Sequence, residues 1–389
     1  MEDLESLFQP GQVSTREETR IAYSRDASRI QGECQAVVWP DSTDDVARLV
    51  RWAVETGIDL VPRGAGTGLC GGATPQNSVV VDSAHLRHLG PVDIQTKQIV
   101  VDAGIPLDHL NRTLHSEGLF LPVIPGSHRS ATVGGMIATN AAGLHAIRYG
   151  RMNDWVEEAV VVDGKGDVHR LSFNDSKYVA GREGLTGMIV QAKLRLAEIP
   201  RNRSLTLLRF EHLEDMLNQI RNLKTNPSLS ALEYLNPQAA VVVGWAAKHT
   251  LLAEYQSGDG EIMDLVEMAT LWKTRESLSA RLTHAGFPIS EDPQIQPETQ
   301  ESILDWLTVQ GIPVFGHLGV GILHPRFLLA DPRIIDLYHR IITAGVQISG
   351  EHGMGLKKRQ CVSDALKSDI VALKTQFDPH RVFNRGKLC

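Results

Sequence analysis

Pro62-Arg63-Gly64-Ala65-Gly66-Thr67-Gly68-Leu69-Cys70-Gly71-Gly72 is the stretch of sequence that decides the fold of this protein. Five of the nine residues from Gly64 to Gly72 are glycine, so few side chains stand between the backbone N–H groups and an anion. The anion that such a turn favours is a pyrophosphate. A plain glycine-rich hairpin is an equally good reading of this segment taken alone.

A helix and a short strand are expected directly before this turn. The segment from Ser42 to Thr56 carries apolar residues at the helical period, with Ser42 or Thr43 as the N-cap and Gly57 as the terminator. The segment from Asp59 to Val61 reads as a strand. Because the order is helix then strand, and no long helix opens after the glycines, the turn is not the Rossmann fingerprint.

Two further clusters of small residues support a nucleotide site. Pro125 to Gly143 contains Gly134-Gly135 and several alanines, so backbone can approach a large planar cofactor closely, and Ser127, Thr132 and Asn140 offer neutral hydrogen bonds. Gly181 to Gly187 forms the third cluster. Regular structure is expected around these clusters: strands at Val79–Asp82 and Ile99–Ala103, a helix at Leu107–His115, and a hairpin of Val156–Val162 with Val168–Leu171.

Two histidine-bearing stretches near the C-terminus suggest a metal site. They are Gly316-His317-Leu318-Gly319-Val320-Gly321-Ile322-Leu323-His324 and Ser349-Gly350-Glu351-His352-Gly353. Two imidazoles and a carboxylate suit a divalent transition metal, and His352 remains for proton transfer. Residues seven apart in a strand face opposite ways, so His317 and His324 converge only if the glycines between them bend the chain. Two hydrogen-bonded core histidines are the alternative.

Composition bounds the class of protein. The chain has 389 residues, 42% of them hydrophobic and 22% charged, which suits two globular domains. A net charge of -7 and a pI near 6.1 give no general attraction to nucleic acid. Met1 to Pro10 does not resemble a secretory signal, and no run approaches the roughly 20 apolar residues of a membrane helix. The four scattered cysteines predict reduced thiols. We therefore expect a cytoplasmic protein, with peripheral membrane association left open.

The three glycine clusters, in this order, resemble the FAD-binding domain of flavoproteins of the vanillyl-alcohol-oxidase superfamily, also called PCMH-type. Trp272-X-X-Arg275-Glu276, the two histidine stretches and the closing Phe377-Asp378-Pro379-His380-Arg381-Val382-Phe383-Asn384-Arg385-Gly386-Lys387 resemble its branch of D-lactate dehydrogenases, flavin-binding glycolate oxidase subunits and D-2-hydroxyglutarate dehydrogenases. The resemblance implies an α+β fold, in which a two-part FAD-binding domain carries a cap of antiparallel sheet plus helices. The implied divisions are 1–200 for the FAD domain, 201–375 for the cap, and 376–389 for a segment returning to the FAD domain.

The resemblance also implies which residues bind the cofactor. Thr67 stands where covalent members of the superfamily carry a flavin-linked histidine, so non-covalent FAD is expected. The implied FAD-binding residues are Arg63, Gly64, Ala65, Gly66, Thr67, Gly68, Gly71, Pro125, Ser127, Thr132, Gly134, Gly135, Asn140, Gly143, Glu183, Gly184, Ile189 and Asn384.

On the cap, the family pattern implies that His317, His324 and Glu351 hold a divalent metal, expected to be zinc. His352 is then the base and Arg275 the contact for a substrate carboxylate, although an ion pair of Arg275 with a nearby glutamate is the alternative. The implied reaction oxidises a D-2-hydroxy acid to the 2-oxo acid by hydride transfer to the flavin. A quinone, an electron-transferring flavoprotein or a cytochrome is expected to take the electrons, in a homodimer or a hetero-complex.

The sequence departs from the family pattern beside the expected metal. Val320 and Ile322 stand where relatives usually have Asp and Asn, so a bulkier or more apolar hydroxy acid is one hypothesis. A flavin-binding subunit of a larger complex, with altered or lost catalysis of its own, is another. A metal hydrolase using the same His-His-Glu site is a third, but it has no use for three glycine clusters.

Overall fold

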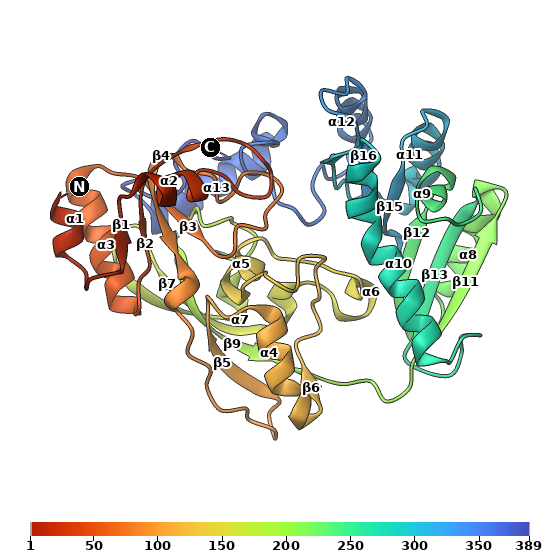
Figure 1. Ribbon diagram of the computed structural model, residues 1–389, viewed down its shortest axis with the longest axis horizontal. Coiled ribbons are helices and arrows are strands. Elements are labelled where there is room, and N and C mark those ends of the chain that lie inside the picture. The colour runs from red at the N-terminus through yellow and green to blue at the C-terminus, as the bar shows by residue number, and fades with distance from the viewer. Residues whose placement is uncertain (1, 389) are drawn as a thin grey trace. The chain divides into compact units, whose positions relative to one another are not determined.

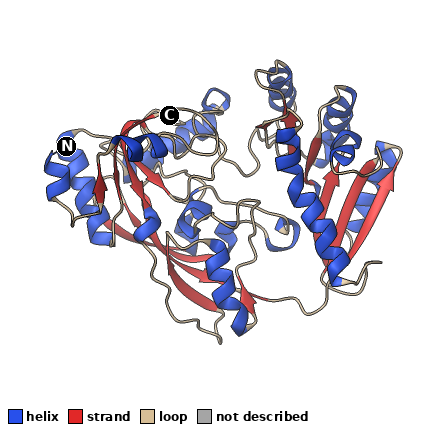
Figure 2. Ribbon diagram, viewed as in Figure 1, coloured by secondary structure: helices blue, strands red, loops and turns tan. Residues whose placement is uncertain are grey.

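The computed structural model describes residues 2–388, which form two compact units (Figures 1 and 2). The first unit takes residues 2–141, 151–199 and 352–388, and the second takes 142–150 and 200–351. The first combines a mainly parallel sheet with antiparallel ones, and the second is an antiparallel sheet with helices. The expected fold class, a two-part α+β domain with an antiparallel cap, is confirmed.

The backbone crosses between the units at other residues than the family pattern implied. The short segment 142–150 belongs to the second unit, because Leu144 packs against the apolar core of that unit and Ala146 packs with Ile322. The return to the first unit begins at His352 instead of residue 376. Both crossings are fixed by contacts between residues far apart in the sequence, which composition does not reveal.

The first sheet of the first unit has the strand order β1-β2-β4-β3, with β2, β4 and β3 parallel and β1 antiparallel. Its buried valines pack with α1 and α3 into one apolar core. The elements of this part are β1 (Val13–Ser14), β2 (Glu33–Val38), β3 (Leu60–Arg63), β4 (Gln76–Asp82), α1 (Glu2–Ser6), α2 (Glu17–Tyr23), α3 (Thr43–Thr56), α13 (Asp364–Phe377), η1 (Ser83–His85) and η5 (Arg359–Cys361).

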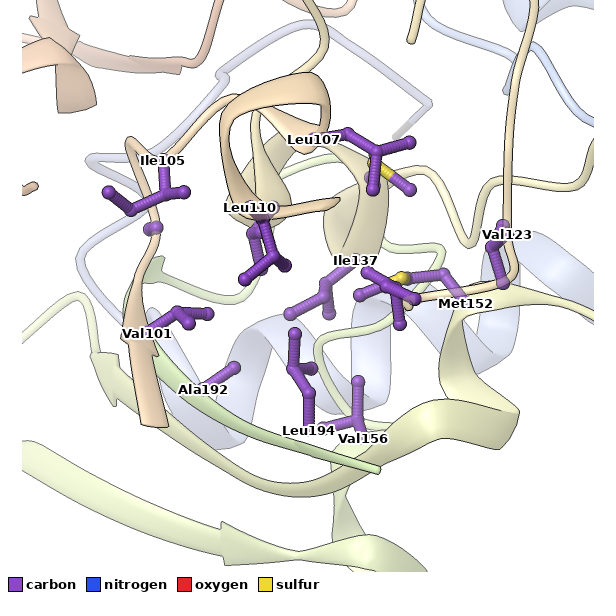
Figure 3. Close-up of a cluster of buried hydrophobic side chains, with 14 of the residues drawn as sticks. Val101, Ile105, Leu107, Leu110, Val123, Ile137, Met152, Val156, Ala192 and Leu194 are labelled. Carbon is purple, nitrogen blue, oxygen red and sulfur yellow. The ribbon is translucent and has the colours of Figure 1, made fainter. Parts of the chain in front are cut away.

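The second sheet of this unit is antiparallel, with the order β5-β9-β7-β8, and β6 pairs with β10 beside it. Figure 3 shows the core under this sheet, where Leu107 and Leu110 of α4 meet Ile137 of α5 and strand residues such as Val101 and Leu194. The elements are β5 (Gln98–Asp102), β6 (Leu119–Phe120), β7 (Val156–Val162), β8 (Val168–Ser172), β9 (Met188–Arg195), β10 (Ala197–Glu198), α4 (Leu107–Leu114), α5 (Val133–Ala138), α7 (Phe173–Ser176), η2 (His115–Glu117) and η3 (Met152–Trp155).

The second unit is built on one antiparallel sheet with the order β11-β13-β12-β15-β16-β14. The long helix α10 lies against it and adds Trp272 and Leu278 to the apolar core (Figure 1). The elements are β11 (Ser204–Phe210), β12 (Leu229–Leu235), β13 (His249–Tyr255), β14 (Ile289–Ser290), β15 (Val314–His317), β16 (Ile322–Phe327), α6 (Ala146–Tyr149), α8 (Leu213–Leu223), α9 (Pro237–Val242), α10 (Leu265–His284), α11 (Pro297–Val309), α12 (Arg333–Thr343) and η4 (Leu318–Val320).

The elements expected around the glycine clusters are present. Helix α3 begins after Ser42, whose side chain accepts from the backbone N–H of Asp45, and ends at Gly57 in the left-handed conformation. The predicted hairpin is the antiparallel pair β7 and β8. Cys34 is a buried free thiol, whereas Cys389 lies outside the described residues. Within residues 2–388, no helix combines the length and apolar character needed to cross a bilayer.

Candidate functional site

The glycine-rich turn, residues 64–72, connects β3 to β4 and is shaped by close packing. A Cβ at Gly64 would collide with the Thr132 hydroxyl, so the first two glycine clusters touch only because this residue has no side chain. Gly66 has a φ of 66°, and a Cβ there would collide with the Arg63 guanidinium. Arg63 Nη1 donates to the carbonyl of Arg25 at 3.0 Å, which fixes this guanidinium under the turn.

The turn presents unused backbone donors. Among the described residues, none accepts a hydrogen bond from the backbone N–H groups of Ala65 to Leu69. At Gly68 the nearest atom to a built Cβ is Asp26 Oδ2, at 3.9 Å, so the space beside that backbone is open. A row of backbone N–H groups without protein acceptors and without blocking side chains fits the diphosphate of a dinucleotide.

The second cluster is held against β5 by its glycines. Thr132 caps α5 by accepting from the backbone N–H of Gly135, and Gly134 donates from its backbone to the carbonyl of Ala103 at 2.8 Å. Asn140 adopts a left-handed φ of 46°, and its Oδ1 accepts from the backbone N–H of Asn153 at 2.9 Å. Gly143 belongs to the second unit.

The third cluster and the C-terminus meet in the same unit. Asn384 is 1% exposed, and its Nδ2 donates to the carbonyl of Glu183 at 2.6 Å. Gly184 leaves room for this contact, because a Cβ there would lie 3.2 Å from Pro62 Cγ and 3.3 Å from Asn384 Nδ2. The structure thus gathers three of the family-implied segments around Pro62. Ile189 is buried in β9, and Pro125 and Ser127 form a turn through their backbone carbonyls.

Two ionisable side chains, the partly buried Glu183 and the buried Lys387, hold this junction together. The Glu183 carboxylate accepts from the backbone N–H groups of Met354 at 2.7 Å and Gly355 at 3.0 Å. Lys387 Nζ donates to the carbonyl of Gly72 at 2.7 Å and to Asn384 Oδ1 at 2.8 Å. Burial raises the pKa of Glu183, and burial lowers the pKa of Lys387 to about 7. The side chain of Glu183, expected beside the cofactor, therefore holds the segment that follows His352.

In the second unit, His317, His324 and Glu351 converge. His324 Nε2 lies 3.2 Å from one Glu351 carboxylate oxygen, and His317 Nε2 lies 3.7 Å from the other. One ligand atom from each residue falls within 4.8 Å of the other two. Imidazole and carboxylate are the ligands that zinc takes at catalytic sites, so this donor set fits a divalent transition metal.

Local structure explains this convergence. β15 ends at His317 and β16 begins at Ile322, so the two histidines stand on paired strands, with His324 opposite Phe315. Gly321 makes the turn with a φ of 76°, and a Cβ there would collide with the carbonyl of Ile295. The bend expected between the histidines is confirmed.

The loop that carries Glu351 is held by Asp292, a fully buried residue in the same unit. Asp292 Oδ2 accepts from the backbone N–H of Glu351 at 2.8 Å and from Ser349 Oγ at 2.9 Å. His352 follows Glu351 directly and opens the segment that returns to the first unit. One carboxylate thus sets the position of the residue that completes the ligand set.

Arg275 binds a carboxylate of the protein itself. Its Nε donates to Glu233 Oε2 at 2.8 Å, its Nη2 contacts the same oxygen, and its guanidinium lies 4.6 Å from the centre of the Phe315 ring. The other oxygen, Glu233 Oε1, lies 2.5 Å from His317 Nδ1. The ion pair considered for Arg275 is therefore present, but it is buried and it continues to a candidate metal ligand.

This network shifts two pKa values. Burial opposes ionisation of Glu233, but Arg275 and His317 outweigh it and lower the pKa of Glu233 to about 2. Burial alone would lower the pKa of His317, yet the Glu233 carboxylate raises it above its ordinary value. Glu233 is thus a fully charged group inside the sheet at neutral pH.

Comparisons with known proteins match the two segments of the chain that carry these candidate sites. Residues 34–172 match the family of the FAD binding domain, and residues 258–388 match the C-terminal domain of FAD linked oxidases. The chain therefore carries both domains of the FAD-linked oxidases and is an FAD-linked oxidoreductase. The first match contains the turn with the unused N–H groups, and the second contains the His-His-Glu cluster.

Three relatives of this FAD-linked oxidoreductase are named after the oxidation of 2-hydroxy acids. The chain is 29% identical to a D-2-hydroxyglutarate dehydrogenase of Xanthomonas citri pv. viticola, covering 91% of this chain and 89% of the relative. It is 28% identical to the glycolate oxidase subunit GlcD of Bacillus subtilis, over 95% and 92%, and 27% identical to a D-lactate dehydrogenase of Archaeoglobus fulgidus, over 90% of each.

The fold of this chain is similar to that of a solved synthase structure. Alkyldihydroxyacetonephosphate synthase matches with a TM-score of 0.72 and 16% identity, over 99% of this chain and 84% of that one. At this identity the likeness concerns the fold alone.

Sequence reasoning did not find three buried charged residues of this flavoprotein: Glu233, Asp292 and Lys387. Glu233 did leave a signal, because it is the only charged residue in the strand Leu229–Leu235, which is otherwise apolar apart from Ser230. A carboxylate in a strand buried along its whole length needs partners. Asp292 and Lys387 each bind one backbone group and one side chain, and no sequence pattern indicates these partners.

Proposed function

We propose that this flavoprotein oxidises a D-2-hydroxy acid to the 2-oxo acid, using non-covalently bound FAD, a divalent metal and His352. One observation carries the proposal: His317, His324 and Glu351 offer three ligand atoms within 4.8 Å of one another, in a protein that also has an FAD binding domain. The named relatives act on D-2-hydroxyglutarate, glycolate or D-lactate, which supports this substrate class.

Each group has a separate task in this proposal. Bound FAD would supply the hydride acceptor, and a zinc or similar ion held by His317, His324 and Glu351 would supply a charge that lowers the pKa of the substrate hydroxyl. The turn from Gly64 to Gly72 holds the diphosphate through backbone N–H groups, and Thr67 offers no imidazole for a covalent flavin link. His352 takes the hydroxyl proton, and Arg275 pairs with the substrate carboxylate.

The apolar residues beside the candidate metal ligands favour an apolar substrate side group. Ile322 is fully buried and packs with Ala142, Ala146 and the partly buried Val320. A Cβ at Gly350, the residue before Glu351, would lie 2.8 Å from Ile322 Cγ1, so this isoleucine touches the ligand loop. We therefore extend the proposal to a bulkier or more apolar hydroxy acid than lactate.

The visible spectrum tests the proposal. Zinc-loaded protein is kept without oxygen and mixed with D-lactate, with a D-2-hydroxy acid that carries a branched alkyl group, or with the L-isomers as controls. Bleaching of the flavin by a D-isomer alone supports the proposal, and faster bleaching by the branched acid supports the apolar extension. His352→Ala is expected to keep its flavin and to bleach about 100- to 10,000-fold more slowly. Bleaching that is equally fast in this variant contradicts the role of His352.

A second function is favoured by one observation. Val320 and Ile322 remove two polar groups beside the metal ligands, which suits a flavin-binding subunit that works inside a larger oxidoreductase complex. In that case the isolated protein stays yellow with every hydroxy acid. In either case a quinone, an electron-transferring flavoprotein or a cytochrome is the proposed electron acceptor.

A further inference from the structure

We propose that Glu233 is a positioning residue that orients the metal ligand His317 and the substrate-binding Arg275 together. The proposal rests on the metal and substrate roles proposed above. Glu233 belongs to β12, an inner strand of the cap sheet, and its side chain is completely buried. A buried carboxylate is tolerated only where hydrogen bonds and opposite charge compensate it, so its partners indicate its role.

The first partner is His317. Glu233 Oε1 lies 2.5 Å from His317 Nδ1, so Nδ1 carries a proton and, in the neutral ring, the lone pair is on Nε2. Nε2 is the nitrogen that faces Glu351 Oε2, at 3.7 Å. A carboxylate that accepts from one imidazole nitrogen fixes the ring and its tautomer for metal binding through the other nitrogen.

The second partner is Arg275. Its Nε and Nη2 are both taken by Glu233 Oε2, and the Phe315 ring lies under the guanidinium. Among the described residues, Nη1 has no hydrogen-bond acceptor, so that nitrogen is left for a substrate carboxylate. Because one carboxylate holds both side chains, Glu233 sets the distance between the metal and the carboxylate site.

A neighbouring carboxylate supplies a matched control. Glu254 of β13 is also buried, and it also binds a histidine and an arginine: His145 Nε2 at 3.0 Å and Arg203 Nη2 at 2.7 Å. It touches none of the three candidate metal ligands in the described residues. Glu254→Gln therefore removes a buried charge from the same sheet without removing the proposed positioning.

The experiment measures zinc affinity of the full-length protein with FAD bound. Metal is removed with a chelator, and Zn²⁺ is returned in competition with a chromophoric chelator, for wild type, Glu233→Gln and Glu254→Gln. We expect Glu233→Gln to bind zinc about 10- to 100-fold more weakly and Glu254→Gln to bind like wild type. Flavin absorbance and thermal melting show whether each variant is folded.

The outcomes separate the two proposals. If wild type binds no zinc tightly, the proposed metal site fails. If wild type binds zinc and Glu233→Gln binds it equally well, the positioning role is overturned. Should Glu233→Gln not fold, the histidine ¹⁵N shifts of zinc-loaded wild type decide: coordination of His317 through Nε2 with a protonated Nδ1 supports the proposal, and coordination through Nδ1 overturns it.

Discussion

At the scale of single residues, Gly66 tests the cofactor turn. We expect Gly66→Ala to weaken FAD binding at least tenfold, because the residue has a φ of 66° and the new Cβ collides with Arg63. Flavin retained after gel filtration, followed by titration of the apoprotein with FAD, measures the loss. Gly118→Ala is the control, since Gly118 has a similar φ of 69° but no atom within 4 Å of the new Cβ. Equal FAD affinity in the two variants would contradict the proposal that the turn around Gly66 binds FAD.

Lys387 makes stability depend on pH. Burial lowers the pKa of Lys387 to about 7, against 10.5 for an ordinary lysine. Between these values the unfolded state holds a proton that the folded state has released, so stability rises with pH. One group contributes at most about 1.4 kcal/mol per pH unit. Below pH 7 the lysine is charged in both the folded and the unfolded state, so burying this charge lowers the free energy of unfolding by its full amount.

Urea unfolding at pH 7.5 and pH 9, followed by flavin fluorescence, measures this dependence. Wild type is expected to gain on the order of 2 kcal/mol between the two values. Lys387→Met lacks the titrating group, so its gain should be much smaller. If both proteins show the same change, Lys387 is not the group responsible.

At the scale of elements, Glu254 ties α6 and α10 to the cap sheet. Its carboxylate accepts from Trp272 Nε1 of α10 at 2.8 Å and lies beside His145, which precedes α6. Burial opposes its ionisation, but His145 and Arg203 outweigh burial and lower the pKa of Glu254 to about 2. A carboxylate whose pKa is lowered on folding contributes stability that is complete above its unfolded pKa of 4.5 and is lost as pH falls toward 2.

We therefore expect Glu254→Gln to destabilise the second unit by on the order of 3 kcal/mol at pH 7. The difference from wild type should shrink as pH falls from 4.5 toward 2. Calorimetric unfolding at several pH values measures both effects. A difference that stays constant over this range would show that packing, and not the charge of Glu254, is what the substitution removes.

The elements also show how far the sequence could predict the structure. Helix α3 was predictable because its signals are local: the period, the Ser42 cap and the left-handed Gly57 lie within 16 residues. The hairpin of β7 and β8 and the bend before His324 were predictable for the same reason. The limits of strands were predicted less well. The strand expected at Asp59 to Val61 is β3, which extends to Arg63.

Contacts between distant segments were not predictable in this way. Glu233 is 84 residues from His317 and 42 from Arg275, and Glu183 is 171 residues from Met354. These pairs depend on strand order and register, which the apolar period of each strand does not determine. His317, His324 and Glu351 could be predicted as a cluster despite their separation, because imidazole and carboxylate are typical metal-binding groups. The role proposed for Glu233 could not be predicted, because a single charged residue in an apolar strand indicates that it needs partners but does not say which.

At the scale of the whole molecule, each compact unit carries one candidate ligand site. The turn proposed to bind FAD belongs to the first unit, and the three candidate metal ligands belong to the second. A ligand that binds only the folded form stabilises the unit it binds, by about 2.7 kcal/mol at 100 times its Kd. Zinc and FAD should therefore act on different unfolding transitions.

Calorimetry with zinc and FAD added separately tests whether each ligand stabilises only the unit that binds it. We expect zinc to raise the melting temperature of one transition and FAD that of another, which flavin fluorescence identifies as the first unit. Chelation should lower only the zinc-dependent transition and abolish hydroxy-acid oxidation, and added zinc should restore both. In His324→Ala, which lacks one of the three ligands, zinc should shift neither transition while FAD still shifts its own. A single transition that either ligand raises by the same amount would instead show that the two units unfold as one, because only cooperative unfolding carries the stabilisation of one unit to the other.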